Sequence, residues 1–275
     1  MINIYPKTDE LFAGIELLKP YINRGLEIQL IKPVENEQLE RMLTRLKLFE
    51  CPNVTEVTLH MNMVDCSLTP YLHNKYKFTR LVSTLTCIGY LQKKLGIKIN
   101  LLVHLVETYD ALERADGLKD MEVLCSYLEE VNVLLLVEND ICIWGVSDMH
   151  DHMMEFVRRI NHPNVRGCLD ICHIYCIANM THMEYAEIPG YIGEGASDFI
   201  HQIHFADTWN NDGYKEMLTH ARYHNEMTIE KDLKLLDTLG ISDKNIVTEV
   251  IEEGKDYTRR DGQIRELELL KKLRG

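Results

Sequence analysis

Long uninterrupted apolar runs are missing from this chain of 275 residues. No segment approaches the roughly 18 apolar residues that a helix needs to cross a bilayer, so we expect no membrane partner. The opening stretch, MINIYPKTDELF, also lacks the basic and then apolar order of a secretory signal. We therefore expect the protein in the cytoplasm.

Positive charge is scarce as well. Lysine and arginine together number 30 against 43 acidic residues, which gives a formal net charge of −13. Binding to nucleic acid requires a basic surface, so this balance disfavours duplex DNA as a partner. Bound divalent cations would add local positive charge that the residue count omits.

The cysteines form no CxxC pair. They are scattered and lie mostly within apolar segments, at Cys51, Cys66, Cys87, Cys125, Cys142, Cys168, Cys172 and Cys176. This pattern favours buried reduced thiols over disulfides. Linkers rich in proline, glycine or serine are missing too, which favours one domain over residues 1–275.

What the sequence does contain is an alternation of short apolar strands with longer helices. We expect eight strands, at residues 2–5, 26–31, 56–60, 99–105, 133–138, 166–170, 202–206 and 245–250. Helical spacing of apolar residues marks 36–49, 78–95, 118–128, 153–160, 228–239 and 263–273. Continuous apolar strands are typical of a parallel sheet covered on both faces. The sequence therefore predicts an α/β protein, a single (β/α)₈ TIM barrel; the alternative, a doubly wound sheet, usually has fewer strands.

Two connections are long, at 171–201 and at 207–244. We expect functional loops there, on the face where barrel active sites form. The segment MHDHM at 149–153 has the residue types of a metal motif, but side chains two apart on a helix face different ways. We interpret it as a solvated helix start.

Ionisable side chains occur at the ends of six successive strands. They are His60, His104, Glu138, Asp170 with His173 just beyond, His204, and Glu249. Each alone is most simply a hydrogen-bonded structural residue. Together, carboxylates at one barrel mouth would repel one another and raise each other's pKa. A divalent cation removes that conflict, and mixed Asp, Glu and His ligands suit Zn²⁺ or Mn²⁺.

Four motifs then carry a family resemblance. They are VEND at 137–140, LDICH at 169–173 within RGCLDICHIYCIAN, IHFAD at 203–207 and VTEV at 247–250. In this order they resemble the ligand-bearing strands of the xylose isomerase-like and endonuclease IV-like TIM barrel superfamily (AP endonuclease family 2), over essentially the whole chain. The resemblance implies a metal site on Glu138, Asp170, His204 and Glu249.

The sugar isomerases and epimerases of this superfamily use one metal ion. By resemblance, Glu138 and Glu249 would move a proton between adjacent carbons, and His173 would hold a substrate hydroxyl. The endonuclease IV branch instead carries a three-metal cluster. The resemblance implies extra ligands for this cluster at His60, His104 and His224, with His173 also a ligand.

Two departures from the endonuclease IV branch bear on the substrate. Arg222 stands where that branch has an aspartate ligand, and Met63 where it has a tyrosine that enters DNA. These changes argue against abasic-site repair in duplex DNA. They leave room for a smaller phosphate ester or phosphorylated sugar, to which Arg222 could offer a bidentate contact.

We therefore expect a divalent-metal-dependent enzyme with an endonuclease IV-like site of two or three ions, acting on a phosphate ester or phosphorylated sugar. The alternative is a one-metal sugar isomerase or epimerase. A further alternative, motivated by Arg222, is a barrel that binds metal and ligand without catalysis. In the enzyme readings Trp144 and Trp209, expected at the barrel mouth, could pack against a sugar.

Overall fold

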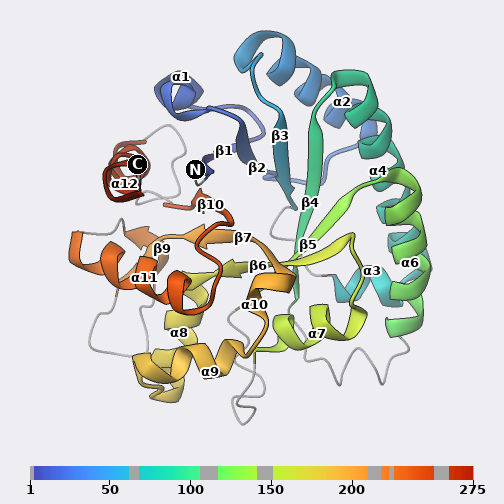
Figure 1. The fold of residues 1–275 in the computed structure, drawn as a ribbon. Coiled ribbons are helices and arrows are strands. Elements are labelled where there is room, and N and C mark those ends of the chain that lie inside the picture. Colours follow the sequence, from blue (N-terminus) through green and yellow to red (C-terminus); the bar gives the residue numbers. More distant parts are fainter. Residues whose placement is uncertain are drawn as a thin grey trace.

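The strands close into a barrel in the computed structural model, which describes residues 3–61, 68–105, 117–140, 151–209, 218–222, 226–250 and 260–274. For residues 70, 207–209, 218–222 and 226 it describes the backbone alone. Eight parallel strands are joined in the order β1-β10-β7-β6-β5-β4-β3-β2 (Figure 1). They are β1 (Ile4–Asp9), β2 (Gly25–Gln29), β3 (Glu56–His60), β4 (Lys98–Leu105), β5 (Leu134–Asn139), β6 (Val165–Asp170), β7 (Ile200–Phe205) and β10 (Asn245–Thr248). The predicted (β/α)₈ barrel is confirmed.

The first strand is the one whose predicted bounds differ most. It was expected to end at residue 5, but β1 continues through Lys7 to Asp9, and both of these side chains are buried. A charged residue in the middle of a strand is unfavourable when it faces lipid or an apolar core. Here it faces the polar interior of the barrel, so the strand extends through it.

Helices cover the outside of the barrel (Figure 1). Those at the predicted positions are α2 (Asn36–Arg45), α4 (Lys75–Leu95), α6 (Gly117–Val131), α7 (His152–Ile160), α11 (Glu226–Thr238) and α12 (Asp261–Arg274); among the described residues, the other α-helices before β6 are α1 (Ile15–Leu18) and α3 (Thr69–His73). Local sequence explains their ends. Glu35 and Gln38 form a capping box at the start of α2, and α4 ends at Gly96, whose φ of 64° favours glycine. A π-helical turn, Leu46–Glu50, continues α2.

The connection after β6 is not the structureless loop that we expected. It contains α8 (Ile171–Thr181), a 3₁₀ turn (Tyr185–Glu187), α9 (Ile188–Ile192) and α10 (Ala196–Phe199). Most of α8 is buried, so its sequence has no polar stripe to reveal a helix. The connection after β7 includes a hairpin, β8 (Asp207–Trp209) with β9 (Leu218–Arg222), paired antiparallel.

Alternation along the strands separates two buried layers. Residues such as Ile28, Leu59 and Leu101 join the large apolar core with the surrounding helices. The opposite faces of β4, β5 and β6 contribute a small separate cluster, formed by Leu102, Leu134, Leu136 and Cys168. Because these faces continue to His104, Glu138 and Asp170, the small cluster is an apolar floor beneath the polar strand ends. No disulfide links the six cysteines of the described residues, and no helix in this part of the chain is long and apolar enough to cross a membrane.

Candidate metal centre

Strand register brings the polar side chains together. Lys7 on β1 is opposite Glu27 on β2. His104 on β4 is opposite Glu138 on β5, and Asp170 on β6 is opposite His204 on β7. Neighbouring strands of a parallel sheet lie about 4.8 Å apart, so side chains at the same level on one face are in contact. The barrel therefore gathers residues that are far apart in the sequence.

The four predicted ligands meet around one ring nitrogen. His204 Nδ1 lies 3.0 Å from Glu138 Oε1 and 2.5 Å from Glu249 Oε2. It is also 3.9 Å from Asp170 Oδ2. One ligand atom from each of Glu138, Asp170, His204 and Glu249 lies within 4.8 Å of the other three. All four side chains are buried.

Asp170 and His173 are brought together by a helix cap. The Asp170 carboxylate accepts a hydrogen bond of 2.8 Å from the backbone N–H of His173 at the start of α8. Nδ1 of His173 lies 2.8 Å from the carbonyl oxygen of Asn139. A carbonyl oxygen only accepts, so the His173 proton is on Nδ1 and its Nε2 is the accepting nitrogen.

The histidines of β3 and β4 lie beside this group. Nε2 of His60 is 2.9 Å from Nε2 of His104. The latter nitrogen is 3.2 Å from Glu138 Oε2. His60, His104 and Glu138 thus form a second set of side chains that could bind a cation.

Sequence reasoning missed two charged members of the site, Lys7 and Glu27. Both are buried, and Lys7 Nζ is 2.8 Å from Glu27 Oε1. Lys7 also contacts Glu249 Oε1 and lies 2.8 Å from His60 Nδ1. The sequence does contain a pattern that could have revealed Glu27. In LEIQLI, Glu27 and Gln29 alternate with apolar residues, as expected for strand side chains that face a polar barrel interior.

Glu27 orients the central histidine. Its Oε2 lies 2.8 Å from His204 Nε2 and accepts a 2.7 Å hydrogen bond from Gln202 Nε2. An Nε2–H directed at Glu27 leaves Nδ1 of His204 facing Glu138 and Glu249. A carboxylate on the far nitrogen is the usual support for a histidine that ligates a metal.

In the site, neighbouring charges shift the pKa values of buried groups in the direction opposite to the effect of burial. Burial alone would raise the pKa of Glu27, but His204 and Lys7 reverse this and hold the pKa well below its ordinary value. The pKa of Glu138 is also lowered, because His204 and His104 outweigh its burial. Burial disfavours charge on His204, yet the surrounding groups, Glu138 and Glu249 among them, raise its pKa well above the ordinary value. The site therefore holds the Glu27 and Glu138 carboxylates ionised.

The two outer histidines shift in opposite directions. Burial and the charge of Lys7 lower the pKa of His60. Burial opposes protonation of His104 as well, but Glu138 and Asp140 raise its pKa. His104 Nδ1 is 3.2 Å from Asp140 Oδ2.

These residues fit a divalent cation. Glu138 Oε2 is buried and, within the described residues, accepts no hydrogen bond. A buried charged oxygen without a hydrogen bond destabilises the folded protein, and a bound cation would provide the missing interaction. Glu27, Glu138, Asp170 and Glu249 bring more negative charge than Lys7 and His204 balance. Carboxylate and imidazole donors suit Zn²⁺ or Mn²⁺.

Several predicted site residues are not placed by side chain. Trp144 and His224 lie outside the described residues. Trp209 and Arg222 belong to the β8–β9 hairpin, of which the backbone alone is described. Their expected contacts with a sugar or a phosphate stay predictions. Asp151, in the predicted helix start, does cap α7, but it is buried rather than solvated.

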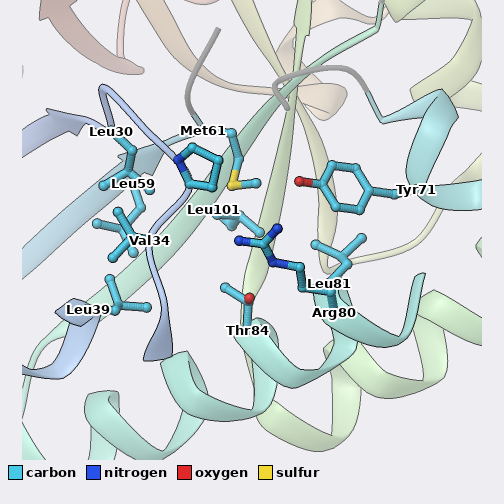
Figure 2. A pocket seen from close by; sticks show the side chains of 11 residues that line it. Leu30, Val34, Leu39, Leu59, Met61, Tyr71, Arg80, Leu81, Thr84 and Leu101 are labelled. Atoms are coloured by element: carbon cyan, nitrogen blue, oxygen red, sulfur yellow. The ribbon is translucent and has the colours of Figure 1, made fainter. Parts of the chain in front are cut away.

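A separate hollow lies outside the barrel, between β2–β4 and helices α2, α3 and α4 (Figure 2). Arg80 extends from α4 into a ring of mainly apolar side chains (Figure 2). The cavity has a volume of about 30 Å³, against roughly 300–1,000 Å³ for a typical ligand site. It has room for water and not for a sugar.

Comparison with known proteins gives a family and a set of folds. The profile of the family described as "Xylose isomerase-like TIM barrel" matches residues 83–273. No curated protein matches the chain significantly.

Three solved structures illustrate the likeness. A xylose isomerase domain protein from Planctomyces limnophilus is 16% identical, with 99% of this chain and 96% of that one covered and a TM-score of 0.62. D-psicose 3-epimerase from Clostridium cellulolyticum H10, solved with D-tagatose, is 12% identical, with coverages of 100% and 98% and a TM-score of 0.60. The IOLI protein, solved with a zinc atom, is 13% identical, with coverages of 98% and 95% and a TM-score of 0.58. At these identities the likeness shows the fold.

Proposed function

Because the chain belongs to the xylose isomerase-like TIM barrel family, we propose that it is a metal-dependent isomerase or epimerase of a ketose-like sugar. The observation that carries the proposal is the meeting of Glu138 and Glu249 at one nitrogen of His204, at 3.0 and 2.5 Å. Two carboxylates directed at one point can serve a substrate from two sides. Solved structures of the same fold include D-psicose 3-epimerase and a D-tagatose 3-epimerase-like protein, which supports a sugar as the substrate class.

The chain's own residues provide the proton chemistry. Glu138, Asp170, His204 and Glu249 would hold the ion, which when bound supplies Lewis acidity that polarises a carbonyl. The pKa of Glu138 is lowered, so this carboxylate is ionised at neutral pH and can accept a proton from carbon. Glu249, from the other side of His204, would exchange a proton with the adjacent carbon.

Other residues would position the sugar. Nε2 of His173 can accept a hydrogen bond from a substrate hydroxyl, because the proton of this ring is directed at Asn139. We further propose that Trp144 and Trp209 cover a face of the sugar. Arg222 would matter only for a phosphorylated substrate.

A phosphate ester remains the second candidate substrate. The observation that favours it is the second ligand set of His60, His104 and Glu138. A second ion there, with His224 as a further ligand, would suit metal-assisted phosphate hydrolysis.

The test is exchange with solvent. The Mn²⁺-supplemented protein is incubated in D₂O with D-fructose, D-psicose and D-tagatose, and NMR follows deuterium at the carbons beside the carbonyl. We expect uptake that Glu138→Gln and Glu249→Gln each slow by about 10²–10⁴-fold, the usual contribution of a general acid–base group. Glu130→Gln, on the exposed face of α6, is the control and should match the wild type. Turnover of a phosphate monoester without any deuterium uptake would favour the second candidate and overturn the first.

A further inference from the structure

A lysine ammonium already occupies one of the cation positions in the site. Lys7 is 2% exposed and lies against Glu27 Oε1, Glu249 Oε1 and His60 Nδ1. The three residues that it contacts also belong to one of the candidate ligand sets, Glu27, His60, His204 and Glu249. The Lys7 side-chain nitrogen therefore sits where those ligands converge.

The two oxygens of Glu249 divide the site. Oε1 contacts Lys7, whereas Oε2 faces His204 Nδ1. A carboxylate between two cations often bridges two metal ions. In this chain the cation beside Oε1 is Lys7, and the side of Oε2, with His204, is the one that would hold the ion.

Lys7 also bears on the tautomer of His60. His60 Nδ1 lies 2.8 Å from the Lys7 ammonium, which only donates, and 3.1 Å from Glu27 Oε1, which only accepts. The shorter contact with Lys7 favours Nδ1 as the acceptor and the ring proton on Nε2. That Nε2–H is directed at His104 Nε2, 2.9 Å away. With His104 neutral, its own proton is on Nδ1, directed at Asp140 Oδ2 at 3.2 Å. In this arrangement the two accepting nitrogens, Nδ1 of His60 and Nε2 of His104, are both engaged in hydrogen bonds within the protein.

We propose that Lys7 takes the place of a second metal ion and makes this a one-ion site. The ion is held by Glu138, Asp170, His204 and Glu249, while His60 and His104 are hydrogen-bonding neighbours and not ligands. The inference rests on the proposed function for the existence of the ion. It goes beyond that function by assigning Lys7 a role and fixing the ion count.

Ion counting tests the inference. Metal-free protein is dialysed against Mn²⁺ at pH 8, and bound ions per chain are measured by elemental analysis. We expect one ion in the wild type and in Lys7→Arg, which keeps the positive charge. Lys7→Met removes the ammonium and frees Glu27, Glu249 and His60, so the ion content should roughly double. His60→Gln should still bind one ion.

Each outcome has a distinct meaning. Two ions in the wild type, or one ion in Lys7→Met, would overturn the role of Lys7 and leave the proposed sugar chemistry standing. No ion in any variant would overturn both. The expected ion counts together with no deuterium uptake on any sugar would overturn the proposed function alone.

A measurement on the wild type covers the case in which Lys7→Met does not fold. ¹⁵N NMR of histidine-labelled protein distinguishes the two ring tautomers, with His60→Gln used to assign the His60 signals. We expect His60 to carry its proton on Nε2 both without metal and with Zn²⁺ bound. A proton on Nδ1, or an Nε2 signal that moves to the metal-bound range, would contradict the proposal.

Discussion

The barrel mouth and the start of α7 both bury carboxylates, and they treat them in opposite ways. Glu27 and Glu138 at the mouth have lowered pKa values despite complete burial. Asp151, which caps α7, is also buried, and its pKa is raised to about 6. Burial penalises the charged form in both places. At the mouth, His204 and Lys7 outweigh that penalty for Glu27, and His204 and His104 outweigh it for Glu138.

The difference separates the candidate metal centre from a helix cap. Backbone N–H groups at the start of α7 bond to Asp151, and Arg158 and His152 favour its charged form, but together they do not offset burial. At the mouth, by contrast, buried cationic side chains lie beside Glu27 and Glu138 and keep these carboxylates ionised. Ionised buried carboxylates are what a divalent ion or a proton-accepting base requires.

The largest expected effect comes from removing the lysine. In the presence of a chelator, Lys7→Met should lower the free energy of unfolding by about 3–5 kcal/mol, because it leaves Glu27 and Glu249 buried without their cation. Urea denaturation measures this. Mn²⁺ should then restore more stability to Lys7→Met than it adds to the wild type.

A lysine at the other end of the barrel is the matched control. Lys98 pairs with Glu56 at 3.3 Å, but its side chain is 48% exposed. Lys98→Met should therefore cost less than about 1 kcal/mol. Equal losses in the two variants would show that the mouth is not the special environment that its pKa values indicate.

The next effect concerns Asp151 and depends on pH. Its pKa rises from 3.8 in the unfolded chain to about 6 in the folded protein. The group therefore contributes its full stability below pH 4 and loses it as the pH rises through about 6. Asp151→Asn keeps a side chain that can cap the helix but does not ionise. Relative to the wild type, this variant should gain about 2–3 kcal/mol between pH 4 and pH 7.

Comparing the two proteins at each pH cancels the titration of the site carboxylates. Urea denaturation at several pH values gives the difference directly. Glu155→Gln, an exposed position in the first turn of the same helix, should show a much smaller change. A difference that does not vary with pH would mean that Asp151 is solvated, as its sequence context first indicated.

The sequence predicted the later strands of the site better than the earlier ones. Glu138, Asp170, His204 and Glu249 stand at the ends of apolar runs, where the change from apolar to ionisable marks both the strand end and the site. Their proximity follows from the barrel, because all eight strands end at one mouth.

The earlier strands do not give that signal. Lys7 follows a proline and is followed two residues later by Asp9, so the segment has the pattern of the start of a loop. Glu27 lies within a strand and not at its end. Which charges pair across a barrel depends on register, such as Lys7 opposite Glu27, and register is a tertiary property. The sequence therefore indicated a cation site but not the cation that the chain itself supplies.

The smallest expected effect tests whether hydrogen bonds help the cations to hold Glu27. Thr58 donates to Gln202 Oε1 at 2.8 Å, and Gln202 donates to Glu27 Oε2 at 2.7 Å. Thr58→Val keeps the shape but leaves the buried Gln202 oxygen without this donor, so it should cost about 1–2 kcal/mol in urea denaturation. Thr58→Ser keeps the hydroxyl and should lose less. If Thr58→Ser lost as much stability as Thr58→Val, packing rather than the hydrogen bond would account for the loss. The ionised state of Glu27 would then depend on Lys7 and His204, without a contribution from Thr58 and Gln202.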